Sequence, residues 1–182
     1  EEKETMMLSE KMVDCLNKQI NLEFYSSNLY LQMSAWASDK GLDGAATFLE
    51  AHAAEEMMHM KRLFDYMIEC GALPRLGAIE GPPTSFDNVK VLFEKILEHE
   101  ILVTRAINEL VHTSFEQKDY STFNFLQWYV AEQHEEETLF KGILDKIDII
   151  GTEGQGLFMI DQELSKLIAA QAAKPAEGAS AN

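Results

Sequence analysis

The stretch Glu55-Glu56-Met57-Met58-His59 decides how this sequence of 182 residues is interpreted. Glu56 and His59 are three residues apart, so on a helix they lie on the same face, one turn from each other. Helical bundles present a carboxylate and an imidazole to one metal ion in this way. Alone the motif is weak, because a Glu and a His at this spacing also occur on solvent-exposed faces. Its meaning depends on what the other helices place at the same level.

The surrounding sequence has the alternating three- and four-residue spacing of core positions that is typical of bundle helices. We expect a first helix capped by Ser9 that ends near 38–41, and a second helix capped by Asp43 that stops at Gly71. Asp87 is the expected cap of the third helix. The core-facing positions predicted in the four helices are Val13, Leu16, Ile20, Glu23, Ser27, Tyr30 and Ser34; Ala45, Leu49, His52, Glu56, His59, Leu63 and Tyr66; Phe93, Ile96, Glu100, Val103, Ile107, Leu110 and Ser114; and Leu126, Tyr129, Gln133, Glu136, Phe140, Ile143 and Ile147.

The link 72–85, rich in Pro and Gly, determines the predicted topology. Extended, it covers about 45 Å at ~3.3 Å per residue, whereas a helix of about 27 residues is ~40 Å long. The link can therefore run the length of a bundle and start the third helix parallel to the second. A short turn at 117–119 leads to the fourth helix, and a short apolar helix over 157–168 follows. The prediction is an all-α, up-down-down-up four-helix bundle with a long crossover and a short fifth C-terminal helix. The predicted organisation is an N-terminal extension 1–8, a bundle domain 9–168 and a flexible tail 169–182.

Each of the four core-facing series is interrupted by acid near its midpoint. The interruptions are Glu23, Glu56 with His59, Glu100, and Gln133 with Glu136. Because helices of similar length have their midpoints at one level, these groups should converge in the core. Buried unpaired, each charge would cost several kcal/mol, so the layer requires cations. Carboxylates with one imidazole suit iron or manganese better than structural zinc. Four Glu and one His match the count for two ions, with Glu56 able to bridge them.

Composition narrows the partners. Thirty-one acidic residues against fifteen Lys and Arg give a formal net charge of -16, which argues against nucleic acid and anionic membranes. Cys15 and Cys70 form no C-x-x-C motif and fit a reducing compartment. No apolar run of about eighteen residues is present, and the acidic stretch 1–5 does not resemble a signal peptide. We therefore expect a cytoplasmic protein with no membrane partner.

Four stretches together make the sequence resemble a ferritin of the bacterial non-haem type. They are Asn21 to Ser27 (NLEFYSS), Glu55 to His59 (EEMMH), Glu100, and Phe123 to Glu137 (FNFLQWYVAEQHEEE). The resemblance runs from about residue 7 to residue 168. It implies a hollow cage of 24 subunits, with the fifth helix at the four-fold axis. It also implies iron storage and detoxification by ferroxidase activity, in which O2 or H2O2 oxidises Fe(II) and the ferric product is stored as a mineral inside the cage.

The same resemblance implies roles for individual residues. One iron would be held by Glu23, Glu56 and His59. The second would be held by Glu56, Glu100 and Glu136, with Gln133 close by. Tyr30 matches a tyrosine beside the centre, and Trp128 matches a nearby tryptophan. Core packing is the alternative for both residues, and for Trp128 it is an equally good explanation.

A third iron position is predicted at Glu55, Glu132 and Glu135. Glu132 and Glu135 are three residues apart on one helix face, next to Glu136. Glu55 is displaced from the core in a similar way on the second helix. The non-haem ferritins that this sequence resembles bind a third iron at matching residues. The alternative is a solvent-exposed acidic face, the interpretation that we adopt for Glu137.

Three other functions compete with ferroxidase storage. A haem-containing bacterioferritin would have a second Glu-x-x-His on the fourth helix, where this chain has Glu136 instead of His. Met57 occupies the place of a haem-ligating Met, but adaptable packing explains this residue. We therefore expect no haem. A di-iron oxidase or peroxidase outside a storage cage would need an apolar substrate pocket beside the metals. A structural bundle without metal would leave the acidic layer unexplained.

Overall fold

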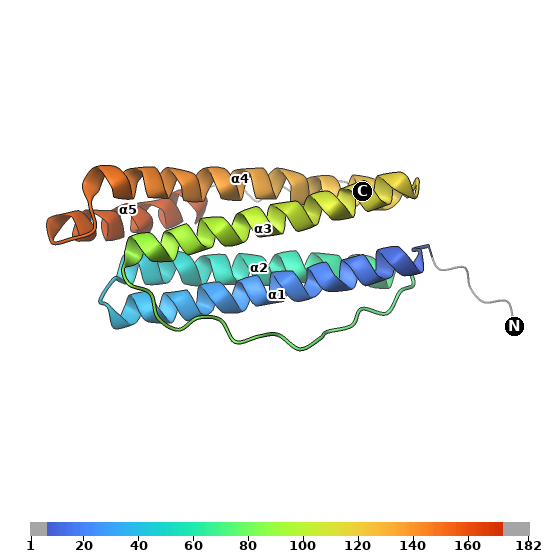
Figure 1. Ribbon diagram of the computed structural model, residues 1–182, viewed down its shortest axis with the longest axis horizontal. Coiled ribbons are helices and arrows are strands. Elements are labelled where there is room, and N and C mark those ends of the chain that lie inside the picture. Colours follow the sequence, from blue (N-terminus) through green and yellow to red (C-terminus); the bar gives the residue numbers. More distant parts are fainter. Residues whose placement is uncertain (1–6, 173–182) are drawn as a thin grey trace, which may run out of the picture.

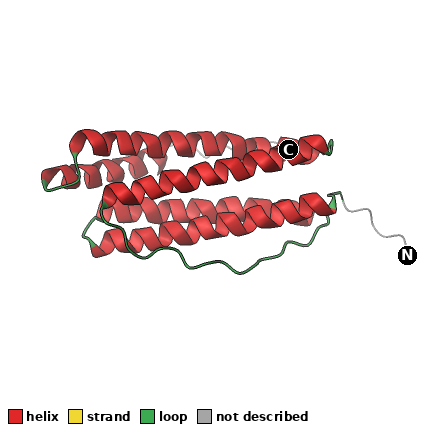
Figure 2. Cartoon of the chain, in the orientation of Figure 1, coloured by secondary structure: helices red, strands yellow, loops and turns green. Residues whose placement is uncertain are grey.

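The computed structural model describes residues 7–172 and contains five α-helices. They are α1 (Glu10–Asp39), α2 (Asp43–Glu69), α3 (Val89–Glu116), α4 (Tyr120–Ile150) and α5 (Gln155–Ala172). The first four lie side by side along the long axis of the molecule, and the segment between α2 and α3 runs the length of the bundle (Figure 1). No strand occurs in the described part of the chain (Figure 2). The predicted up-down-down-up bundle with one long crossover is confirmed.

Several helix ends lie where the sequence signals place them. The Ser9 side chain accepts a hydrogen bond from the Met12 N–H at 3.1 Å and caps α1. Gly41 and Gly71 follow α1 and α2 with φ angles of 73° and 76°, a backbone conformation that glycine adopts without steric cost. The predicted cap of α3 was wrong by one residue, because Asn88 and not Asp87 accepts the Val91 N–H. Asp and Asn are equally good caps, so sequence alone does not decide between neighbours.

The predicted cap of α2 was wrong for a different reason. Asp43 is the first residue of α2, and the preceding Leu42 supplies no side-chain cap. Instead Asp161 of α5 accepts the Gly44 and Ala45 N–H groups at 3.1 and 2.8 Å. A Cβ atom at Gly44 would collide with the Asp161 carbonyl oxygen. The start of α2 is therefore capped by a residue more than a hundred positions later in the chain, at a close contact that requires glycine.

The crossover is held on α1 by two asparagines. The Asn17 side chain accepts the Arg75 N–H at 2.7 Å, and the Asn21 side chain accepts the Gly77 N–H at 2.7 Å and donates to the Arg75 carbonyl at 3.2 Å. These bonds satisfy backbone groups of an extended segment that has no sheet partner. The crossover is consequently fixed along α1 without secondary structure of its own.

The hydrophobic core consists of two clusters. One contains Phe48, Phe93 and Phe140, and the other contains Leu16, Leu63 and other side chains toward the start of α1. All but two of the predicted core-facing residues are buried; Val13 and Tyr66 are half-buried. The buried charged residues therefore separate two dry regions, which is the arrangement that the interrupted helical pattern predicts.

The predicted domain limits need two adjustments. Leu8, placed in the N-terminal extension, is 3% exposed and packs in the core. The predicted tail begins at residue 169, but α5 continues to Ala172. Residues 1–6 and 173–182, which hold the rest of the predicted extension and tail, lie outside the described residues. Among the helices described, none is long and apolar enough to cross a membrane.

Candidate metal centre

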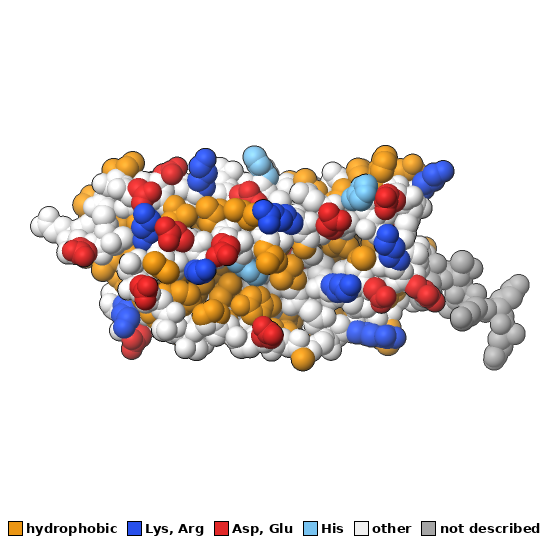
Figure 3. Space-filling view, in the orientation of Figure 1, with side chains coloured by type: hydrophobic (Ala, Val, Ile, Leu, Met, Phe, Trp, Pro, Cys, Tyr) orange, Lys and Arg blue, Asp and Glu red, His pale blue; other side chains and the backbone are white. Residues whose placement is uncertain are grey.

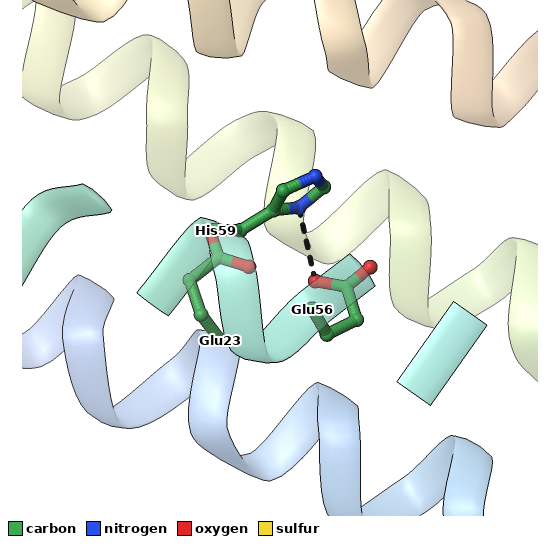
Figure 4. Close-up of side chains that lie close together, drawn as sticks. All are labelled: Glu23, Glu56 and His59. Atoms are coloured by element: carbon green, nitrogen blue, oxygen red, sulfur yellow. Dashed lines mark ion pairs between the residues drawn. The ribbon is translucent and has the colours of Figure 1, made fainter. Parts of the chain in front are cut away.

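The Glu56 and His59 motif of α2 forms a buried cluster with a residue of α1. Glu23, Glu56 and His59 each offer one ligand atom, and these atoms lie within 4.8 Å of one another. Their exposures are 1%, 2% and 5%. His59 Nδ1 lies 3.3 Å from a Glu56 carboxylate oxygen, and Glu23 of α1 points toward these two side chains of α2 (Figure 4). We call these three residues the central cluster.

Glu100 of α3 is held from two sides. The Tyr30 hydroxyl donates to one carboxylate oxygen, and Gln133 Nε2 donates to the other at 3.0 Å. Gln133 also reaches the Glu100 carbonyl and the Thr104 hydroxyl, both at 3.3 Å. Tyr30 is fully buried and Glu100 is 1% exposed. These two donors orient Glu100 within the layer predicted from the sequence.

The acidic residues disturb one another's ionisation. Burial, followed by the Glu56 carboxylate, raises the pKa of Glu23 well above its usual range. Burial, followed by Glu100, does the same to the pKa of Glu56. Burial and the Glu136 charge raise the pKa of Glu100 to about 7, although the bonds from Tyr30 and Gln133 oppose the rise. Without cations these carboxylates are therefore driven toward their protonated forms.

A second group lies between α2 and α4. His52, Glu55 and Glu136 also bring ligand atoms within 4.8 Å of one another. His52 Nε2 is 3.6 Å from Glu136 and 3.8 Å from Glu55, while its Nδ1 lies 3.1 Å from the Phe48 carbonyl. Although burial disfavours the imidazolium, the neighbouring Glu136 carboxylate raises the pKa of His52 overall. We call these three residues the second cluster.

His52 is the site residue that the sequence pattern did not reveal. The sequence pattern places it among the core positions and indicates no chemical role for it. Its spacing contains the signal, since His52 and Glu55 are three residues apart and His52 and Glu56 are four apart. A histidine among core positions is usually a packing residue, so only its carboxylate neighbours in space distinguish it.

The three residues predicted for a third iron do not all meet. Glu55 joins the second cluster, with 40% of its side chain exposed. Glu132 lies instead 3.9 Å from His59 Nε2, and Glu135 is exposed. Glu135 and Glu136 line an open cavity of about 540 Å³ between α4 and the end of α5. The second cluster consequently lies beside a space that water and ions can enter.

Three buried atoms support cation binding directly. Glu23 Oε2, His52 Nε2 and Glu136 Oε2 are buried and make no hydrogen bond among the described residues. A buried polar atom without a partner costs about 1–3 kcal/mol, and more if it is charged. Carboxylate oxygens with imidazole nitrogens are a ligand set for iron and manganese. Cations placed in the two clusters would satisfy all three atoms.

Aromatic residues enclose His59. The Trp128 ring lies edge-on to His59 with centroids 5.3 Å apart, and the Arg62 guanidinium is 4.4 Å from the Trp128 ring. The Tyr129 hydroxyl donates to the His59 carbonyl at 2.6 Å. These contacts fix the His59 ring and the backbone that carries it, so Trp128 has a neighbour in the site as well as a packing role.

A long-crossover helical bundle with a carboxylate and histidine layer defines a class of metal-binding bundle proteins. The family model described as a ferritin-like domain matches residues 13–150, and the chain belongs to the ferritin family. A non-haem ferritin-like protein of Haemophilus influenzae is 58% identical over 161 residues, which cover 88% of this chain and 98% of the relative. A bacterial non-haem ferritin of Escherichia coli is 54% identical with the same coverage.

Solved structures agree with this membership. An open-pore ferritin from Archaeoglobus fulgidus superimposes with a TM-score of 0.86 at 43% identity, covering 88% of this chain and 98% of that chain. A Chlorobium tepidum ferritin superimposes with a TM-score of 0.78 at 49% identity, covering 87% and 98%. The resemblance to bacterial non-haem ferritins found in the sequence is confirmed.

Proposed function

We propose that the protein stores iron and acts as a ferroxidase that oxidises Fe(II) with O2 or H2O2. The observation that carries the proposal is the convergence of Glu23, Glu56 and His59 in a dry core, beside Glu100 and Glu136. Two ferrous ions would fit this ligand set, with Glu56 between them. Iron is here the substrate, and the oxidised product would pass to a ferric store.

The side chains would contribute in distinct ways. Glu23, His59, Glu100 and Glu136 would each bind one ion, and the layer's negative charge would lower the energy of Fe(III) more than that of Fe(II). Tyr30 and Gln133 would hold Glu100 in place through the bonds described above. The second cluster, beside the cavity that Glu135 lines, would take a third iron more weakly because it is partly open to water. Glu132, which lies near His59, would bind on the same side of the central cluster.

A cage of 24 copies is part of the proposal. The similar solved structures include the open-pore ferritin of Archaeoglobus fulgidus and an engineered closed form of that ferritin. In this chain α5 leaves Phe158 and Met159 65% and 52% exposed, and Ile149 is 84% exposed at the end of α4. An apolar surface of this kind is usually covered by another subunit. A cytoplasmic location is proposed with it, supported by the free cysteines Cys15 and Cys70.

One experiment tests storage and assembly together. Purified protein is loaded with Fe(II) in air and separated by size, and iron is assayed in every fraction. We expect many ferric ions per chain to elute in one peak of about 24 chains. A monomer carrying only two irons would favour the di-iron oxidase or peroxidase alternative, and a peak without iron would favour a structural bundle.

The haem-containing alternative has a separate test. Met57 is 38% exposed on α2, so it is available to a partner copy or to a haem. We expect protein expressed with haem precursors to lack a Soret band. A band at one haem per two chains that disappears in Met57→Leu would identify a bacterioferritin instead.

A further inference from the structure

A cavity separate from both clusters opens between α1 and α3, beside the end of the crossover. It has a volume of about 190 Å³, and its walls include Tyr25, Leu29, Met33, Phe86, His99 and Leu102. Hydrophobic side chains gather between α1 and α3 on this face of the molecule (Figure 3). Engineered apolar cavities of about 150 Å³ bind benzene, so this one has room for a single aromatic ring. We call it the α1/α3 cavity.

His99, a polar residue in the wall of this cavity, forms a hydrogen bond with Ser26 of α1. The Ser26 hydroxyl donates its only proton to the Leu22 carbonyl at 3.1 Å. His99 Nε2 lies 2.7 Å from the same Ser26 oxygen. With the Ser26 proton given to Leu22, we assign the ring proton to Nε2, which then donates to Ser26. In the neutral ring Nδ1 is then an acceptor, and no donor reaches it among residues 7–170. The cavity consequently offers an acceptor beside aromatic and aliphatic side chains, and the ion pair of Lys95 with Glu98 also lines it.

The ring of His99 also links the cavity to the metal centre. Its centroid lies 5.6 Å from that of Tyr25 and 6.5 Å from that of Tyr30, which meets it edge-on. Tyr30 is fully buried and its hydroxyl donates to Glu100. A molecule in the cavity would therefore be separated from a carboxylate of the acidic layer by two aromatic rings.

We infer that the α1/α3 cavity binds a small phenol-type molecule, whose ring packs on Tyr25 and Leu29 and whose hydroxyl donates to His99 Nδ1. A hydroquinone bound there would reduce ferric ions in the acidic layer through His99 and Tyr30. One hydroquinone gives up two electrons and two protons and becomes a quinone, while two Fe(III) become two Fe(II). The protons leave to water at the cavity mouth. The second part rests on the proposed function, and the binding part does not.

The binding part is tested on metal-free, assembled protein with 4-fluorophenol, followed by fluorine NMR. Leu102 and Leu31 are matched, because they are 51% and 52% exposed and only Leu102 lines the cavity. We expect saturable binding in the unaltered protein and in Leu31→Trp, and binding at least about tenfold weaker in Leu102→Trp, whose indole fills the mouth. His99→Phe keeps a ring and removes the acceptor, so it should also weaken binding about tenfold, the equivalent of one hydrogen bond.

The redox part is tested on protein loaded with two Fe(III) per chain, with a ferrous chelator reporting reduction. Hydroquinone should reduce Leu102→Trp at least about tenfold more slowly than Leu31→Trp, whereas dithionite should reduce both equally. Absence of saturable 4-fluorophenol binding, or equal binding in the two tryptophan variants, overturns the cavity as a site. If Leu102→Trp binds 4-fluorophenol more weakly than Leu31→Trp but hydroquinone reduces Fe(III) equally fast in both variants, electron transfer through His99 and Tyr30 is overturned. Failure of the protein to oxidise Fe(II) would refute the proposed function, and the 4-fluorophenol titration would still decide the site.

Discussion

The central and second clusters use the same ligand chemistry in different surroundings. Glu56 and Glu55 are consecutive on α2, about 100° apart around the helix. Glu56 is 2% exposed and lies with Glu23 and His59, whereas 40% of the Glu55 side chain is exposed beside His52 and Glu136. One residue step thus separates a dry site from one that water reaches. Because charge interactions are stronger where water is excluded, the first should bind cations tightly and the second should exchange them.

The largest expected effect is loss of the central cluster. Glu56→Ala and His59→Ala should each lower the initial rate of Fe(II) oxidation by about 100-fold or more, since a metal ligand matters at least as much as the residues that orient it. Stopped-flow absorbance measures the rate, and gel filtration checks that the cage persists. Glu137→Ala is the matched control, a half-buried acid on α4 that belongs to neither cluster. A normal initial rate in Glu56→Ala or His59→Ala would contradict the assignment of the central cluster as the site of Fe(II) oxidation.

An effect of intermediate size is expected when pH is changed, and it concerns the stability of the metal-free protein. Glu100 has a pKa of about 7, raised by burial and the Glu136 charge, whereas the unfolded chain has the ordinary value of 4.5. Between these values the folded chain holds a proton that the unfolded chain has released, so metal-free protein should lose stability as pH rises from about 4.5 through 7. The loss from Glu100 is about 3 kcal/mol. The raised pKa values of Glu23 and Glu56 act in the same direction.

Thermal unfolding of metal-free protein at several pH values measures this loss. Glu100→Gln should flatten the pH dependence, whereas Glu109→Gln, an exposed acid on the same helix, should leave it unchanged. Bound iron should reverse the trend, because its ligands must be deprotonated. Metal-free protein that is more stable at pH 8 than at pH 5.5 would contradict the described burial of the layer.

The smallest effect is expected when the half-buried acids Glu55 and Glu132 are replaced. Glu55→Ala and Glu132→Ala should keep the fast oxidation but change the iron consumed per O2 and slow later turnovers. The reason is their position next to the central cluster, since Glu55 directly precedes Glu56 on α2 and Glu132 lies 3.9 Å from His59 Nε2. Simultaneous O2 uptake and Fe(II) oxidation over several additions provide the measurement. If both quantities match those of Glu137→Ala, the two residues belong to a solvent-exposed acidic face.

The sequence predicted what repeats along a helix and missed what depends on distant partners. The level of Glu23, Glu56, Glu100 and Glu136 follows from helical spacing, and the structure buries all four. Asp161 escaped notice as the cap of α2, because nothing local in the sequence links it to Gly44. The role of His52 and the shape of the α1/α3 cavity likewise depend on side chains from other helices.

The Asp161 cap gives the C-terminal helix a place in the engineering of this protein. A truncated chain that stops before Asp161 would leave the Gly44 and Ala45 N–H groups without their acceptor, and a lost cap costs about 1 kcal/mol. The damage would appear at the start of α2, about two turns from His52. Cargo attached beyond Ala172 would leave the Asp161 cap of α2 in place. An insertion in the turn before α5 would shift Asp161 and disturb the cap. The far end of the chain is therefore a handle on the metal-binding helix.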